Sequence, residues 1–174
     1  MFQTLKNKLK EQRGLTLIEL LAVIVILGII AAIAIPSIMG LIDNSKKDAH
    51  VSNAIQMVNS VKTAVAADKS LLPDKNPVYL SLDYLVEKGY IEEFKDPDTN
   101  GEYVTVEYDE TAALPATIDT GSYVKIEKKG NTLVYSVRLV GGERNIPETS
   151  STALERSIVG KNPDKPVTTK PEGT

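Results

Sequence analysis

The chain has 174 residues, with 20 Lys and Arg against 23 Asp and Glu, one His and no Cys. A net charge of −3 argues against a broad basic surface for nucleic acid, because phosphate binding needs clustered Lys and Arg. The Cys and His content excludes a Cys/His metal cluster and a cysteine nucleophile, and no other catalytic constellation is evident, so we expect that the protein is not an enzyme.

An apolar run from Leu15 to Ile35 is the most informative segment, and one carboxylate, Glu19, lies near its start. These 21 residues are long enough to cross a bilayer as a helix, at ~1.5 Å per residue against a hydrocarbon core of ~30 Å. A carboxylate at the bilayer centre costs roughly 2.5–3.5 kcal/mol or more, and near the helix end it still requires a cationic partner. No Lys or Arg lies within the run. The sequence therefore predicts a membrane-spanning helix with one unpaired carboxylate.

A short basic leader precedes the run and ends in Gly14. The sequence MFQTLKNKLKEQRG followed by LTLIEL resembles the type IV prepilin signal, also called the class III signal peptide. The resemblance implies that a prepilin peptidase cuts between Gly14 and Leu15, that Leu15 becomes an N-methylated terminus, and that Glu19 is retained in the mature helix. Leu15 departs from the Phe that is usual at this position. The resemblance is specific over residues 9 to about 68.

Two other residues match the N-terminal helix of the same family, Gly28 and Pro36. With Glu19, they form the set that the resemblance implies for filament assembly. Pro36 removes one backbone donor and clashes with the preceding turn, so we expect a kink or a locally melted segment there. Gly28 weakens the helix and also permits close contact between helices.

A secretory signal peptide and a plain membrane anchor are the alternative interpretations of the N-terminus. A secretory signal is cut after its apolar region, whereas Gly14 lies before it, so that cutting there keeps the helix. A plain anchor explains the hydrophobicity but not Glu19. The basic leader also places the bulk of the chain outside the cytoplasm by the positive-inside rule, and its removal takes away four basic residues and one acidic residue.

The second half of the helix is predicted to be amphipathic. We expect one helix over residues 15–67, with a membrane or filament-core part over 15–42 and an amphipathic part over 43–67. Apolar residues recur in the second part at spacings of three and four, which places them on one face: Val51, Ala54, Val58, Val61 and Val65. We expect that face to pack on the chain's own globular head, because the pattern is too short for a free coiled coil.

Residues 68–160 are predicted to form that head. Residues 80–89 are expected to be a short helix with Ser81 as its N-cap, and alternating patterns predict strands over residues 103–108, 123–128 and 133–139. Gly130-Asn131 is a hairpin turn signal between the last two strands. The fold class is therefore α+β, a type IV pilin fold in which the long helix packs on a small antiparallel sheet. Residues 161–174 are expected to be a disordered tail.

One loop carries a metal-like pattern. Asp96, Asp98, Asn100 and Glu107 satisfy the oxygen-ligand spacing of an EF-hand loop, which would suit calcium. The alternative is a polar turn, because loops favour Asp, Asn and Gly, and we assign no firm metal site or cofactor. His50 is expected to be a solvated residue on the polar side of the helix.

The sequence thus predicts a structural subunit of a type IV pilus for adhesion, motility or DNA uptake. The close alternative is a pseudopilin of a type II secretion or competence system, and a third class is a membrane-tethered binding module that does not polymerise. Expected partners are other copies of the chain, the prepilin peptidase, an inner-membrane assembly platform with its ATPase, and membrane lipid before assembly. We expect a single-pass membrane protein that later becomes part of an extracellular pilus. The absence of Cys favours a Gram-positive or other disulfide-free pilin.

Overall fold

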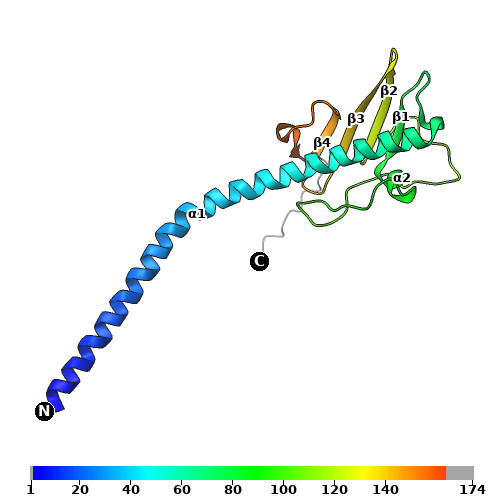
Figure 1. Cartoon of the computed structure of the whole chain (residues 1–174). Coiled ribbons are helices and arrows are strands. Elements are labelled where there is room, and N and C mark those ends of the chain that lie inside the picture. Colours follow the sequence, from blue (N-terminus) through cyan, green and yellow to red (C-terminus); the bar gives the residue numbers. More distant parts are fainter. Residues whose placement is uncertain (1, 164–174) are drawn as a thin grey trace, which may run out of the picture. The chain divides into compact units, whose positions relative to one another are not determined.

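The computed structural model describes the backbone of residues 2–163 and the side chains of residues 17–163. Helix α1 (Phe2–Ala67) runs through two compact units, Met1–Asp43 and Asn44–Thr174 (Figure 1). The helix is continuous through Pro36, so the locally melted segment that we expected there is not present. The first unit is helical throughout its described part, and the second contains the globular head.

The head is built on a five-stranded antiparallel sheet with strand order β1-β2-β3-β4-β5 (Figure 1). Its strands are β1 (Val78–Ser81), β2 (Tyr123–Lys129), β3 (Thr132–Val140), β4 (Arg144–Ser150) and β5 (Gly160–Lys161). Helix α2 (Leu82–Glu87) follows β1, and two short 3₁₀ helices lie at Lys69–Leu71 and Arg156–Ile158. This arrangement confirms the predicted α+β fold.

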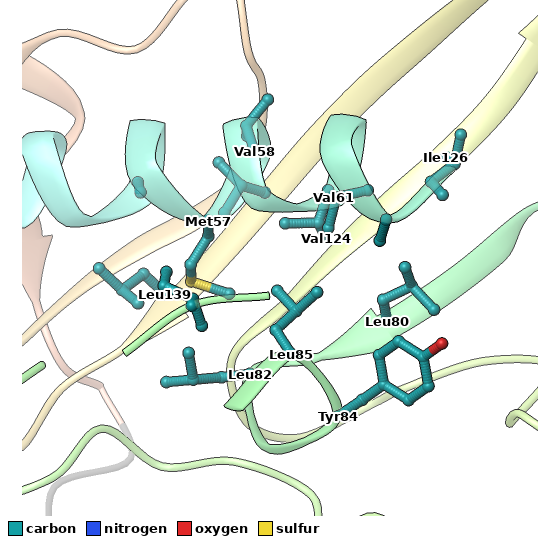
Figure 2. Close-up of a cluster of buried hydrophobic side chains, with 14 of the residues drawn as sticks. Met57, Val58, Val61, Leu80, Leu82, Tyr84, Leu85, Val124, Ile126 and Leu139 are labelled. Carbon is teal, nitrogen blue, oxygen red and sulfur yellow. The ribbon is translucent and has the colours of Figure 1, made fainter. Parts of the chain in front are cut away.

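The predicted apolar stripe forms the helical side of the core. Ala54, Val58, Val61 and Val65 are buried, and Val51 packs against the same cluster from the edge. Figure 2 shows helix α1 above side chains from the sheet and from α2, with Met57 between the layers. Because a head of this size buries a modest core alone, the helix face supplies much of its apolar contact.

Two local predictions in the head are confirmed. Ser81 caps α2, and its Oγ accepts a hydrogen bond from the Tyr84 N–H at 3.1 Å. Strands β2 and β3 form the predicted hairpin, with Lys129 opposite Thr132 and Gly130 at φ 64° in the turn. Both features depend on residues adjacent in the sequence, which is why their patterns predicted them.

The strand predicted over residues 103–108 was wrong, because that segment has no regular secondary structure. Its backbone is held by isolated hydrogen bonds and not by the regular hydrogen bonding of a neighbouring strand. Val104 donates its N–H to Val140 O and accepts from Ser122 N–H, while Tyr108 donates its N–H to the Asp83 carboxylate at 2.6 Å. Side chains of α2 and isolated backbone groups thus take the place of a neighbouring strand.

The sheet also contains strands that the sequence patterns did not predict: β1, β4 and β5. Strand β4 has only one fully buried apolar residue, Ile146, and it carries Pro147, so it lacks the alternation that marks a strand. Lys161, the first residue of the predicted disordered tail, pairs with Arg144 as part of β5. Residues 164–174 of that tail lie outside the described residues.

Truncating a core side chain should destabilise the head strongly. Leu85 is fully buried in the cluster of Figure 2, and Leu→Ala changes at such positions cost about 2–5 kcal/mol because a cavity remains. We expect Leu85→Ala to lower the free energy of unfolding of the full chain in detergent by that amount. Leu72→Ala is the matched control, because Leu72 is 40% exposed. Equal losses from the two variants in denaturant titrations would contradict this assignment of the core.

Candidate functional site

The first half of α1 carries the most extensive exposed apolar surface of the described chain. Its large apolar side chains are between 51% and 70% exposed: Leu17, Ile18, Leu20, Leu21, Val23, Ile24, Val25, Ile26, Leu27, Ile29, Ile30, Ile33, Ile35, Ile38, Met39, Leu41 and Ile42. Burying one such side chain is worth about 1.5–3 kcal/mol, so a surface of this extent requires lipid or protein around it. By length and composition, this is the one helix in the described chain that could cross a membrane.

Glu19 lies within this apolar surface. Its side chain is exposed between Ile18 and Leu20, and it has no ion-pair partner among residues 17–163. A carboxylate surrounded by apolar groups is stable only when a cation or a hydrogen-bond donor reaches it. Because the described part of the chain supplies neither, the partner of Glu19 must come from outside these residues.

Gly28 and Pro36 lie on the same part of α1. A Cβ added to Gly28 would meet nothing within 4 Å, so no contact inside the described chain requires a glycine there. Near Pro36, the Ser37 hydroxyl donates to Ile33 O at 3.2 Å, a bond of the kind that often bends helices. The roles that the sequence predicted for Gly28 and Pro36 in assembly stay predictions. The same holds for Gly14 and Leu15, whose side chains lie outside the described residues.

A second feature is a buried polar cluster in the head, formed by His50, Asp96, Asp98 and Tyr103. The prediction that His50 is solvated was wrong, because its side chain is 1% exposed. A signal for burial was present in the sequence, since His50 lies one helical turn before Ala54 and thus continues the apolar stripe. The partners of His50 could not be found in the same way, because they lie about 50 residues away in the sequence.

Hydrogen bonds satisfy both ring nitrogens of His50. Its Nε2 lies 3.0 Å from Asp98 Oδ2 and 3.6 Å from Asp96 Oδ1, while its Nδ1 forms a hydrogen bond with the Tyr103 hydroxyl at 2.8 Å. The Tyr103 oxygen in turn accepts from Asn53 Nδ2 at 3.1 Å. These contacts connect α1 to the loop that precedes Tyr103.

The loop itself is held by Asp96. Its Oδ1 accepts from Asp98 N–H and its Oδ2 from Gly142 N–H, each at 2.8 Å. A Cβ on Gly141 would lie 2.8 Å from Asp96 Oδ2, and one on Gly142 would lie 2.8 Å from Thr99. Glycines at both positions therefore let the turn between β3 and β4 approach the Asp96 carboxylate, which fixes that side chain.

Two cations balance the carboxylates of the cluster. Lys46 Nζ lies 3.5 Å from Asp98 Oδ1, and Arg144 Nε lies 3.6 Å from Asp98 Oδ2. Burial raises the pKa of the Tyr103 hydroxyl well above its usual range, the hydrogen bond from Asn53 opposes that rise, and the two carboxylates add to it. Tyr103 therefore stays neutral.

The structure brings together part of the predicted calcium set. Asp96 and Asp98 lie beside His50, and these three form a group of side chains that could hold a metal. Glu107 is exposed and is not part of that group. Asn100 has φ 57°, in the left-handed region that Asn tolerates, and its N–H bonds to Asp96 O. Calcium binding by Asp96, Asp98, Asn100 and Glu107 stays a prediction.

Removing the Tyr103 hydroxyl should destabilise the head. Tyr103→Phe leaves His50 Nδ1 and Asn53 Nδ2 without their partner, and an unsatisfied buried polar group costs about 1–3 kcal/mol. We expect a loss of that size in denaturant titrations of the full chain. Tyr79→Phe is the control, because no hydrogen bond of the Tyr79 hydroxyl occurs among the described residues, and it should stay within about 0.5 kcal/mol of the unmodified chain. Equal losses of stability from Tyr103→Phe and Tyr79→Phe would contradict the hydrogen bonds assigned to the Tyr103 hydroxyl.

The chain matches a model of the prokaryotic N-terminal methylation motif over residues 9–35. It is 30% identical over 107 residues to type II secretion system core protein G of Klebsiella michiganensis, a match that covers 56% of this chain and 75% of that protein. The match to the Klebsiella protein covers more residues than the long helix contains, whereas the methylation motif lies within the apolar helix and its leader.

Shorter matches involve both secretion and fimbrial proteins. The chain is 37% identical over 51 residues to type II secretion system core protein G of Escherichia coli K12, covering 29% of this chain and 35% of that protein. It is 43% identical over 58 residues to the type IV major fimbrial protein FimA of Dichelobacter nodosus, covering 33% and 37%. These two matches thus span little more than a third of the relatives. No solved structure matches the chain.

Proposed function

Because the chain belongs to the type IV pilin family, whose members include fimbrial proteins and type II secretion core protein G, we propose that it is a structural subunit of a type IV pilus. The subunit is cut after Gly14, methylated on Leu15 and polymerised through its apolar helix. The observation that carries the proposal is the exposed apolar half of α1 with Glu19 inside it, a carboxylate that has no ion-pair partner among residues 17–163. A filament core made of several such helices would cover that surface.

The proposed assembly begins in the membrane. Before assembly, lipid surrounds the apolar half of α1, and the chain is a single-pass membrane protein. A prepilin peptidase removes the leader, and an assembly platform with its ATPase extracts the subunit into the filament at the cell surface. Adhesion, motility and DNA uptake are the functions that such a filament supports. The protein's role is then structural and not enzymatic.

In the proposed filament, Glu19 forms an ion pair with the N-terminal amine of a neighbouring subunit. Cleavage creates a cationic amine at Leu15, and an incoming subunit places this amine beside Glu19 of a subunit already in the filament. A buried ion pair contributes little net stability, whereas the loss of one partner costs about 3–5 kcal/mol. The pair therefore sets the register between subunits, and packing of the apolar side chains supplies the affinity.

Mass measurement on sheared filaments tests this function. Filaments are sheared from the cell surface, and the intact mass of their main subunit is determined. A mass equal to residues 15–174 plus one methyl group would support cleavage, methylation and the role of main subunit together. An uncut mass found only in the membrane fraction would overturn the proposal.

A pseudopilin of a type II secretion or competence system is the second candidate. The match to the Klebsiella core protein G favours it, because that match covers 75% of the relative and reaches beyond the helix. The same shearing experiment separates the two candidates. A processed and methylated subunit that stays in the membrane fraction, with none in the sheared fraction, would favour the pseudopilin.

A further inference from the structure

We infer that His50, Asp96 and Asp98 form a binding site for a divalent transition-metal cation of the zinc class. The ligand atoms are Nε2 of His50 and one carboxylate oxygen from each aspartate. His50 and Asp96 are buried, Asp98 is partly buried with its side chain 5% exposed, and the ligand atoms lie within 4.8 Å of one another. This inference does not depend on filament assembly, because all three residues belong to the unit that contains the head.

The spacing of the ligand atoms fits a small cation. His50 Nε2 lies 3.0 Å from Asp98 Oδ2 and 3.6 Å from Asp96 Oδ1. Ligands at ~2.0–2.1 Å from a tetrahedral zinc ion lie ~3.3 Å from one another, between the two observed values. Two of the three separations thus bracket the zinc value, and the third, between the two carboxylate oxygens, is at most 4.8 Å.

Neighbouring groups orient the ligands. Tyr103 bonds to His50 Nδ1, which leaves Nε2 directed toward the aspartates, and Gly142 N–H and Asp98 N–H fix the two oxygens of Asp96. With a metal on Nε2, the single ring proton of a neutral imidazole lies on Nδ1, from which it can be donated to the Tyr103 oxygen. Contacts of this kind hold the tautomer and ring orientation of metal-binding histidines.

The donor set selects the class of metal. An imidazole nitrogen with two carboxylates suits zinc and similar transition metals, whereas calcium prefers six to eight oxygen ligands. This site therefore differs from the calcium set that the loop sequence alone predicts, since it uses His50 from α1 and leaves out Glu107. A bound ion would connect α1 to the loop at Asp96 and so stabilise the head.

The site opens to solvent beside Asp98. An open pocket of about 580 Å³ is lined by Lys46, Asp98, Glu143, Arg144, Lys161 and Asn162. The cations at 3.5 and 3.6 Å from the Asp98 oxygens lie beyond the 2.7–2.9 Å typical of charge-assisted hydrogen bonds. They balance the carboxylate charge without occupying its lone pairs at close range. Lys46 is also 37% exposed and has space to turn toward solvent.

Calorimetric titration with ZnCl₂ tests the inference on the full chain, purified in detergent without a histidine tag and treated with a chelator. We expect one saturable site and a higher melting temperature with zinc. His50→Gln should weaken binding by at least about tenfold, whereas Glu107→Gln, which alters only the calcium set, should leave it unchanged. Lys46→Gln should tighten binding several-fold, because it removes a competing cation from Asp98. A gain in affinity cannot result from misfolding.

Spectroscopy identifies the ligand directly. His50 is the only histidine and the chain has no Cys, so a zinc-induced shift of one imidazole ¹⁵N resonance in the full chain would assign the metal to Nε2. No saturable zinc binding, equal zinc binding by His50→Gln, or weaker binding by Lys46→Gln would each overturn the inference. Saturable binding of CaCl₂ but not of ZnCl₂ would also overturn it, and would favour the loop's calcium set.

Discussion

Replacing Glu19 with alanine is expected to abolish filament assembly while cleavage and membrane insertion continue. The side chain has no ion-pair partner among residues 17–163, so its removal breaks no such contact within the described chain. Insertion should not suffer, because a carboxylate in a membrane helix is unfavourable and alanine is not. The defect should therefore appear only when subunits meet.

The expected size of the Glu19→Ala effect follows from the proposed ion pair. The amine of an incoming Leu15 would be buried without its carboxylate, at a cost of about 3–5 kcal/mol. At about 1.4 kcal/mol for each factor of ten, subunit addition weakens by roughly two to three and a half orders of magnitude. Filaments should be undetectable in the sheared fraction, with normal amounts of processed subunit in the membrane.

Ile18→Ala is the matched control for Glu19→Ala. It removes apolar packing from the neighbouring position, which is 67% exposed, but it keeps the carboxylate. Loss of part of one side chain among the many that cover the helix should reduce filament yield only partially. A normal yield from Glu19→Ala, measured by immunoblotting of sheared and membrane fractions, would refute the ion-pair proposal. It would instead favour a tethered protein that does not polymerise.

Local patterns predicted α2, the β2–β3 hairpin and the buried face of α1, but not the other three strands of the sheet. The stripe through Ala54 and Val61, the Ser81 cap and the hairpin at Gly130 each depend on residues within one or two turns or on directly paired strands. Strand β4 was not predicted because it lies between β3 and the short β5 and buries one large apolar residue, Ile146. Its place in the sheet depends on pairing with β3, which no pattern within β4 encodes.

Long-range contacts account for the remaining differences. The alternation over residues 103–108 resembles a strand, but its residues bond individually to α2 and to the ends of other strands. The polar cluster has the same origin, since His50 and Tyr103 meet only after α1 has packed on the head. Periodicity could indicate that His50 faces the core, but not that Asp96 and Asp98 lie beside it there.

Replacing Gly14 with leucine is expected to abolish cleavage and, with it, filament formation. The proposed cut follows this glycine, where the absence of a Cβ would let the backbone approach the peptidase closely. A leucine side chain would fill that space. The uncut chain would keep its leader, which carries Lys6, Lys8, Lys10 and Arg13. It would also lack the amine at Leu15 that is proposed to pair with Glu19.

Gly28→Leu separates the effect of cleavage from that of a bulky side chain in the same helix. A Cβ at Gly28 meets nothing within 4 Å, so this variant should fold, insert and be cut normally, and any loss would appear at assembly. For Gly14→Leu we expect only the full-length mass in the membrane fraction, because a charged leader is costly to place in an apolar filament core. A product of mature mass from Gly14→Leu would refute the cleavage site and leave the methylation motif without its new terminus at Leu15.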